Sequence, residues 1–225
     1  MITKKHILPL GAALALTLFP STVHAAAIIT DGQTVGGTMT NLNLSLTASP
    51  TGIRPTAGNA TLSNDVGGNL LFTPNSSVTS DYFVTWSGLA LSTTTYKYVE
   101  ITFTSVTSGA VNAGWQTFFQ DDDSTVGGGS SSGHGIGTGI VGTAPFSVVI
   151  DMTALTGGSG GTTGARGWGP GQLDILRFDM FEDTANFGKT FTISQVKLGT
   201  QLIPEPSTVL LGSFGMLALV LRRRR

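Results

Sequence analysis

The sequence predicts an all-β protein, an antiparallel β-sandwich or jelly roll with long Gly-rich loops and a short helix at each end. Three observations predict it. Hydrophobic residues recur with a period of two through the middle of the chain. No stretch there has a helical stripe, and its Thr, Ser, Val and Gly residues are poor helix formers. Sixteen of the 31 glycines fall in two stretches, 127–142 and 157–171, which indicates two long loops.

The clearest strand is YVEITFTSV, residues 98–106. It places Val99, Ile101 and Phe103 on one face and Glu100, Thr102 and Thr104 on the other. This alternation is typical of a half-buried strand. Four further segments continue the pattern: GWQTFFQ (114–120), PFSVVIDM (145–152), LDILRFDM (173–180) and TFTISQVKL (190–198).

Two of these strands change phase. The inward set shifts between Ile175 and Leu176 in one, and between Ile193 and Val196 in the other. A shift of this kind predicts a β-bulge or a strand end. Several short strands separated by turns indicate a sandwich or jelly roll.

The first 25 residues have the features of a secretory signal peptide. Lys4 and Lys5 precede an apolar stretch, and the small residues Val23 and Ala25 precede a suitable cleavage point. A buried N-terminal helix is the alternative, but Pro20 and the cationic start fit it less well. We therefore expect residues 1–25 to be removed and residues 26–203 to be exported.

Charge and cysteine content limit the partners of the exported part. It contains six basic and twelve acidic residues, a net charge of −6. A polyanion such as nucleic acid would be repelled, so we expect no nucleic-acid partner. The chain has no cysteine, so disulfides contribute nothing to its stability even outside the cell.

The C-terminal segment, residues 204–225, combines three features. Pro204, Glu205 and Pro206 are followed by fifteen uncharged residues and then by Arg222, Arg223, Arg224 and Arg225. The uncharged stretch would be about 22 Å long as a helix, against about 30 Å for a hydrocarbon core. Snorkelling arginines and local thinning would let it insert in the inner membrane, with the arginines in the cytoplasm and the domain outside.

These features together resemble the PEP-CTERM sorting signal of exported proteins in Gram-negative bacteria that make exopolysaccharide. The resemblance implies recognition by an exosortase, removal of the hydrophobic tail, and release or attachment at the cell surface. Ile203 stands where Val is frequent in the family. A permanent membrane anchor is the alternative.

A second resemblance concerns the domain itself. The order of segments 96–101, 115–119, 173–179, 188–193 and 196–198 resembles that of galactose-binding-like jelly rolls, which occur in many carbohydrate-binding modules. The resemblance spans roughly residues 60–199 and implies a fold more than a ligand.

Acidic residues supply two candidate sites. Asp121, Asp122 and Asp123 would repel one another unless a cation or solvent separates them, which predicts either a calcium site or a solvated acidic turn. Asp174, Asp179, Glu182 and Asp183 offer enough carboxylates for a glycosidase pair. The alternating positions of Arg177 and Asp179 predict instead a surface ion pair.

Aromatic side chains are candidates for stacking on a sugar. Trp168, next to Arg166 in a glycine-rich loop, would either bind carbohydrate or anchor the loop by packing, and Trp86 and Trp115 are expected in the core. The spelling of Gly129–Gly133 fits a nucleophile elbow beside His134, but an elbow needs a strand-to-helix turn that the sequence does not predict.

We therefore expect a non-catalytic exported protein of the cell surface or extracellular matrix that contacts polysaccharide. A carbohydrate-active enzyme on a jelly roll and a structural matrix protein without a specific ligand are the alternatives.

Overall fold

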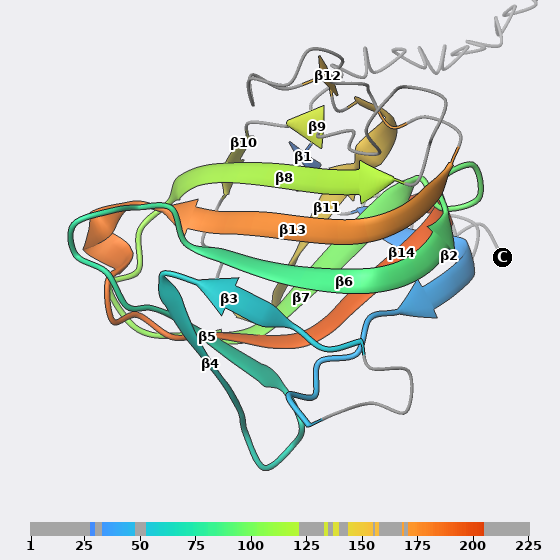
Figure 1. Ribbon diagram of the computed structural model, residues 1–225. Coiled ribbons are helices and arrows are strands. Elements are labelled where there is room, and N and C mark those ends of the chain that lie inside the picture. The colour runs from blue at the N-terminus through green and yellow to red at the C-terminus, as the bar shows by residue number, and fades with distance from the viewer. Residues whose placement is uncertain are drawn as a thin grey trace, which may run out of the picture.

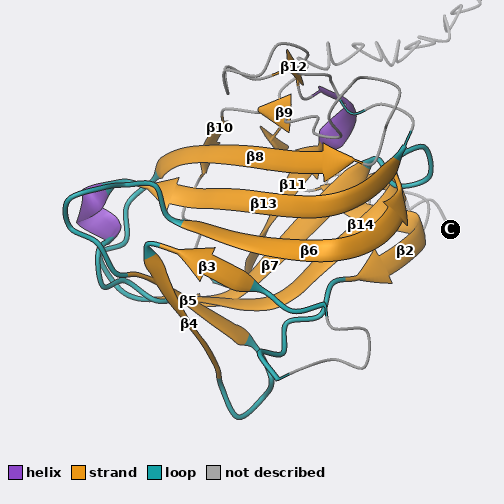
Figure 2. Ribbon diagram, in the orientation of Figure 1, coloured by secondary structure: helices purple, strands orange, loops and turns teal. Residues whose placement is uncertain are grey.

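The computed structural model describes residues 28–29, 33–47, 53–121, 133–134, 137–139, 144–154, 156–157, 168 and 171–204 (Figure 1). These residues form two antiparallel sheets that pack face to face, with strand ribbons nearly throughout (Figure 2). The predicted all-β sandwich is confirmed. The two helices predicted at the ends of the chain lie outside the described residues.

The larger sheet has seven strands. Its order is β1-β11-β7-β14-β5-β4, and β2 also pairs with β14. The strands are β1 (Ile28–Ile29), β2 (Gln33–Asn41), β4 (Ala60–Asn64), β5 (Leu70–Pro74), β7 (Tyr98–Val106), β11 (Phe146–Asp151) and β14 (Phe191–Pro204).

The smaller sheet has five strands in the order β10-β8-β13-β6-β3. They are β3 (Thr56–Gly58), β6 (Phe83–Ser92), β8 (Ala113–Asp121), β10 (Gly137–Gly139) and β13 (Gln172–Glu182). A separate pair is formed by β9 (Gly133–His134) and β12 (Thr156–Gly157), and two short 3-10 helices are η1 (Met152–Ala154) and η2 (Thr184–Asn186).

Aromatic side chains from both sheets fill the space between them. Phe103 of β7 contacts Trp115 of β8 edge-on, with ring centroids 6.2 Å apart. Phe181 and Phe191 stack at 4.2 Å. Trp86 and Trp115 are completely buried, as predicted. The Trp86 indole donates to the Asn43 carbonyl, whereas the Trp115 indole nitrogen has no hydrogen-bond partner among the described residues.

The five predicted strands are present, and the phase shifts correspond to irregularities in the ladder. The register of β13 shifts between Leu173 and Ile175, a residue or two before the predicted position. The register of β14 with β7 shifts between Ile193 and Gln195, as predicted. One prediction was wrong: Glu100, assigned to an outward face, is only 6% exposed because the start of β2 covers it.

No helix in the described part of the chain is long and apolar enough to cross a membrane. Most of the two glycine-rich stretches also falls outside the described residues, which there include only the short strands β9, β10 and β12, Trp168 and Gly171. His134, predicted to lie in a loop, belongs to β9 and pairs with Thr156.

Candidate functional site

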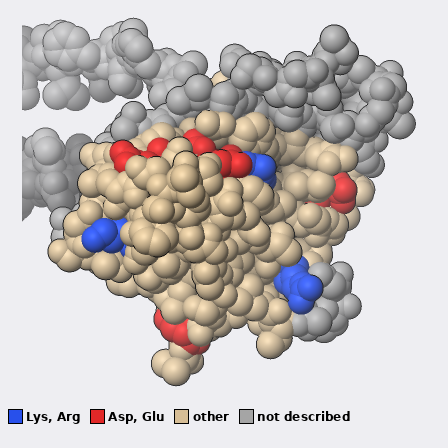
Figure 3. Space-filling view, turned by 60° about the vertical axis from the view of Figure 1, so that its left-hand side comes forward, with Lys and Arg blue, Asp and Glu red and all other residues tan. Residues whose placement is uncertain are grey.

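A cluster of acidic side chains lies on the outer face of the five-stranded sheet. Alternation along β13 directs Leu176, Phe178 and Met180 into the core, so Arg177 and Asp179 point outward. Asp81 precedes β6 and Glu182 ends β13. Carboxylate oxygens of Asp81, Asp179 and Glu182, hereafter the carboxylate cluster, all lie within 4.8 Å of one another. Figure 3, turned so that the end of the sandwich with η2 comes forward, shows acidic side chains gathered in a row.

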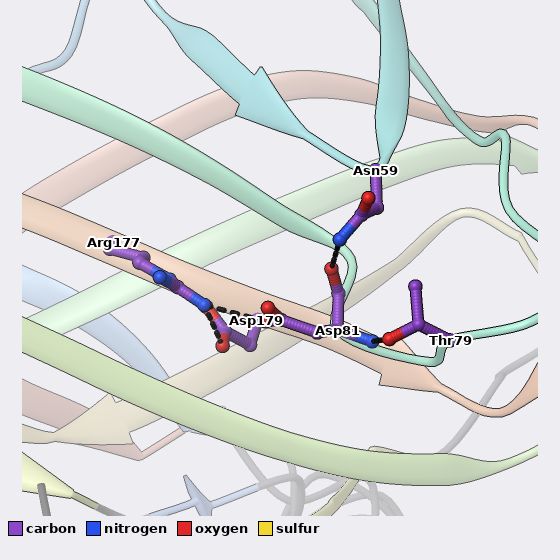
Figure 4. A network of polar contacts seen from close by, with 5 residues as sticks. All are labelled: Asn59, Thr79, Asp81, Arg177 and Asp179. Carbon is purple, nitrogen blue, oxygen red and sulfur yellow. Dashed lines mark hydrogen bonds and ion pairs between the residues drawn. The ribbon is translucent and has the colours of Figure 1, made fainter.

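Arg177 is the cation of this cluster. Its Nε and one terminal nitrogen donate to the two oxygens of Asp179 at 2.5 and 2.6 Å. The same terminal nitrogen donates to Asp81 Oδ1 at 2.6 Å (Figure 4). The predicted ion pair of Arg177 and Asp179 is therefore confirmed, although Asp179 is only 1% exposed and not a surface residue.

Local structure fixes the position of Asp81. Asn59, in the turn between β3 and β4, has the positive φ of 49° that asparagine tolerates. Its amide donates to the Asp81 carbonyl at 2.9 Å, and the Asp81 N–H donates to Thr79 Oγ1 at 3.2 Å (Figure 4). The loop is thus held where the carboxylate of Asp81 meets Arg177.

Two phenylalanine rings flank the guanidinium. It lies 3.6 Å from the ring centroid of Phe83 and 5.0 Å from that of Phe118. The Phe83 ring also covers Gly58, its partner on β3, where an added Cβ would lie 2.1 Å from Phe83 Cζ. The glycine therefore makes room for the ring, and the ring supports Arg177 through a cation–π contact.

Burial dominates the protonation of the cluster. Loss of solvent raises the pKa of Asp179 from 3.8 to about 6, even though Arg177 acts in the opposite direction. Burial, together with the negative charges of Asp179 and Asp81, raises the pKa of Glu182 to about 7, against a hydrogen bond from Gln116. Near neutral pH the cluster therefore contains ionised and protonated carboxyl groups side by side.

This arrangement has three chemical capacities. Carboxylate oxygens are ligands that hard cations prefer. A protonated carboxyl beside an ionised one is the arrangement that acid–base catalysis of glycoside hydrolysis uses. Carboxylates and the Gln116 amide beside an aromatic ring can also bind sugar hydroxyls without any reaction.

Trp168 lies away from this cluster and is held by the sandwich. Its indole N–H donates to the carbonyls of Thr93 and Tyr96 at 2.9 and 2.8 Å. Its ring meets Phe119 edge-on at 4.9 Å. These are contacts of a packed loop anchor, the alternative that the sequence left open, while carbohydrate binding by Trp168 stays a prediction.

The other predicted ligand residues are not described. Arg166, Asp122 and Asp123 lie outside the described residues, and Asp121 is described only as the last residue of β8. The calcium site predicted there stays a prediction.

The last strand leads into the C-terminal segment. β14 runs to Pro204, which is in register with Gln33 of β2. Residues 202–225 match the family model of the PEP-CTERM protein-sorting motif. The chain ends in a PEP-CTERM sorting motif. This motif implies an exported protein that an exosortase processes and sorts to the cell surface.

The predicted sorting residues all fall within the matched PEP-CTERM segment. Pro204 is the last residue of β14, whereas Glu205, Pro206 and Arg222 to Arg225 lie outside the described residues. No curated protein matches the chain. The resemblance to galactose-binding-like jelly rolls has no support, because the family match covers only the tail.

Sequence reasoning named Asp179 and Glu182 but missed Asp81, Phe83 and Phe118. Asp81 is 96 residues before Arg177 in the chain, and the two meet only because β6 pairs with β13. The sequence did contain one signal: the alternation of residues in β6 and β8 places Phe83 and Phe118 on the outward face. Once the strand order is known, this places both rings beside Arg177.

Proposed function

We propose that this chain is a non-catalytic exported β-sandwich that, after exosortase processing, acts at the cell surface or in the extracellular matrix by contacting exopolysaccharide. The observation that carries this proposal is the PEP-CTERM motif, which begins within the last strand of the sandwich.

The outer face of the five-stranded sheet supports the contact with polysaccharide. Glu182, Gln116 and Phe118 combine a carboxyl, an amide and an aromatic ring, the groups that hydrogen-bond and stack on sugars. The alternation along β8 places Gln116 and Phe118 on the same outward side, because Trp115, Thr117 and Phe119 are buried.

Two measurements on protein made by the natural host test the proposal. The mass of the mature protein should lack Arg222 to Arg225, and a mature product that retains them would contradict processing. The mature protein should bind at least one glycan on an array, and Gln116→Ala should weaken that binding while Gln201→Ala, at an exposed position of β14, should not. Equal loss in both variants, or no binding to any glycan, would leave the structural matrix alternative.

The carboxylate cluster favours one further candidate, a carbohydrate-active enzyme. Glu182, with a pKa raised to about 7, would act as the acid beside Asp179, whose pKa is about 6. An enzyme would release reducing ends from exopolysaccharide, and Glu182→Gln would abolish the release without abolishing binding. Binding without release supports the non-catalytic proposal.

A further inference from the structure

The sorting motif begins inside the folded sandwich. The family match starts at residue 202, and β14 continues to Pro204, so three residues belong both to the motif and to the sheet. In the ladder, Leu202, Ile203 and Pro204 pair with Val35, Thr34 and Gln33 of β2. The register of β14 with β7 ends earlier, at Gly199. β2 is therefore the strand that pairs with the start of the motif.

Glycines bring the two strands into close contact. A Cβ at Gly36 would lie 2.1 Å from Ile203 Cδ1, so the Ile203 side chain occupies the space that the glycine leaves. A Cβ at Gly199 would lie 2.3 Å from Val35 Cγ1, and Val35 is only 2% exposed. The start of the motif is thus packed against β2 as well as hydrogen-bonded to it.

Glu100 fixes the same end of β2 to the centre of the sheet. One carboxylate oxygen, Oε2, accepts from the Val35 N–H at 2.8 Å, from Thr34 Oγ1 at 2.7 Å and from Lys197 Nζ at 2.9 Å. Burial of Glu100 would raise its pKa, but these three donors outweigh burial and lower it. Glu100 therefore remains ionised at neutral pH and ties β7, β14 and β2 together.

We propose that β2 clamps the start of the sorting motif, and that residues 202–204 must separate from β2 before the processing enzyme acts. The proposal rests on the exosortase processing proposed above. An enzyme that binds an extended peptide pairs with a backbone edge of it and contacts alternate side chains, and β2 already pairs with one edge of residues 202–204 and contacts the Ile203 side chain. Separation at a strand end requires only local opening, so the sandwich stays folded while the motif is released.

A reversible cross-link tests the clamp. Val35 donates its N–H to Glu100, so Val35 and Leu202 form a pair without mutual hydrogen bonds, the type with closely spaced Cα atoms. Because the chain has no cysteine, Val35→Cys with Leu202→Cys can form one intramolecular disulfide only. The conversion of full-length precursor to mature protein is measured by pulse-chase labelling and mass spectrometry, in cells that contain the exosortase, with and without reductant.

We expect the oxidised pair to be processed at least about tenfold more slowly than wild type, and the reduced pair at the rate of the Leu202→Cys single variant. Thr102→Cys with Ser147→Cys is the matched control, since these residues face each other between β7 and β11 with hydroxyl oxygens 3.0 Å apart. Its oxidation should not change processing. An oxidised Val35–Leu202 pair processed at the wild-type rate would overturn the clamp.

A second variant tests the clamp without a cross-link. Thr34→Val removes one donor to Glu100 and should speed processing, whereas Thr102→Val, the same change away from β2, should not. Equal rates in the two variants would contradict the proposal. If the wild-type precursor is not processed at all, the proposed function is wrong. If the cross-linked chain is processed at the wild-type rate, only the clamp is wrong, so the two failures can be told apart.

Discussion

Replacing Arg177 by methionine should destabilise the sandwich in a way that depends on pH. The guanidinium holds both oxygens of Asp179, whose side chain is only 2% exposed. Methionine keeps much of the apolar contact with Phe83 but leaves the Asp179 carboxylate without its cation. Removing one partner of a buried pair costs about 3–5 kcal/mol when the other partner stays charged.

Protonation of Asp179 limits that cost at low pH. Its pKa in the folded protein is already raised from 3.8 to about 6, which corresponds to about 3 kcal/mol. The folded state therefore binds a proton that the unfolded chain releases, and stability falls as the pH rises from about 4 to about 7. Without Arg177 the pKa rises further, so the loss continues to higher pH.

We therefore expect Arg177→Met to cost about 3 kcal/mol at pH 8. At pH 5, where Asp179 is largely protonated in both proteins, we expect about 1 kcal/mol from the weakened hydrogen bonds. Urea unfolding should show the larger loss as a shift of the midpoint of roughly 1–2 M at pH 8.

Two variants control the measurement. Arg54→Met makes the same change at an exposed arginine and should shift the midpoint little at either pH. Arg177→Met combined with Asp179→Asn should lose the part of the pH dependence that Asp179 causes and keep the part that comes from Glu182. A destabilisation by Arg177→Met of the same size at pH 5 and pH 8 would refute the reasoning.

Three further predictions concern the same sandwich. Because the pKa of Glu182 is raised, wild-type protein should be more stable to urea at pH 5 than at pH 8. Glu182→Gln should reduce this difference in stability, and an unchanged difference would contradict the prediction. Gly58→Ala should displace the Phe83 ring and cost about 1–3 kcal/mol, read as a lower Tm, whereas a wild-type Tm would show that the ring moves freely. Trp168→Phe keeps the ring but removes the indole N–H from two carbonyls, so thermal unfolding should show a loss of about 1–3 kcal/mol, and no loss would mean that the anchor depends on the ring alone.

The sequence predicted the sandwich because hydrophobic residues alternate along each strand with the same period of two as the buried positions. In β7, each of Val99, Ile101 and Phe103 is inward and at most 1% exposed. Bulges were also visible, because an extra residue changes the phase of the inward set, as at Ile193 in β14. These are local signals, which one strand shows by itself.

What the sequence could not show depends on strand order. Glu100 has the outward phase of a surface residue, but the ladder brings Thr34 and Val35 over it from 66 and 65 residues earlier in the chain. The carboxylate cluster likewise needs β6, β8 and β13 to lie side by side. A carboxyl that is outward in its own strand can therefore become buried, with a changed pKa, through segments distant in sequence.

The junction between the sandwich and the tail depends both on the local sequence and on the pairing of distant strands. From the sequence, the sandwich was expected to end at Ile203 and the sorting segment to begin at Pro204. Pro204 is nevertheless in register with Gln33, because the last residue of a strand can lack a donor without breaking the pairs before it. From Pro204 to Ser207, where the uncharged segment starts, three residues span at most about 11 Å. So short a connection leaves little chain between the sandwich and the uncharged segment, which is why the proposed opening at the end of β14 would control access to the motif.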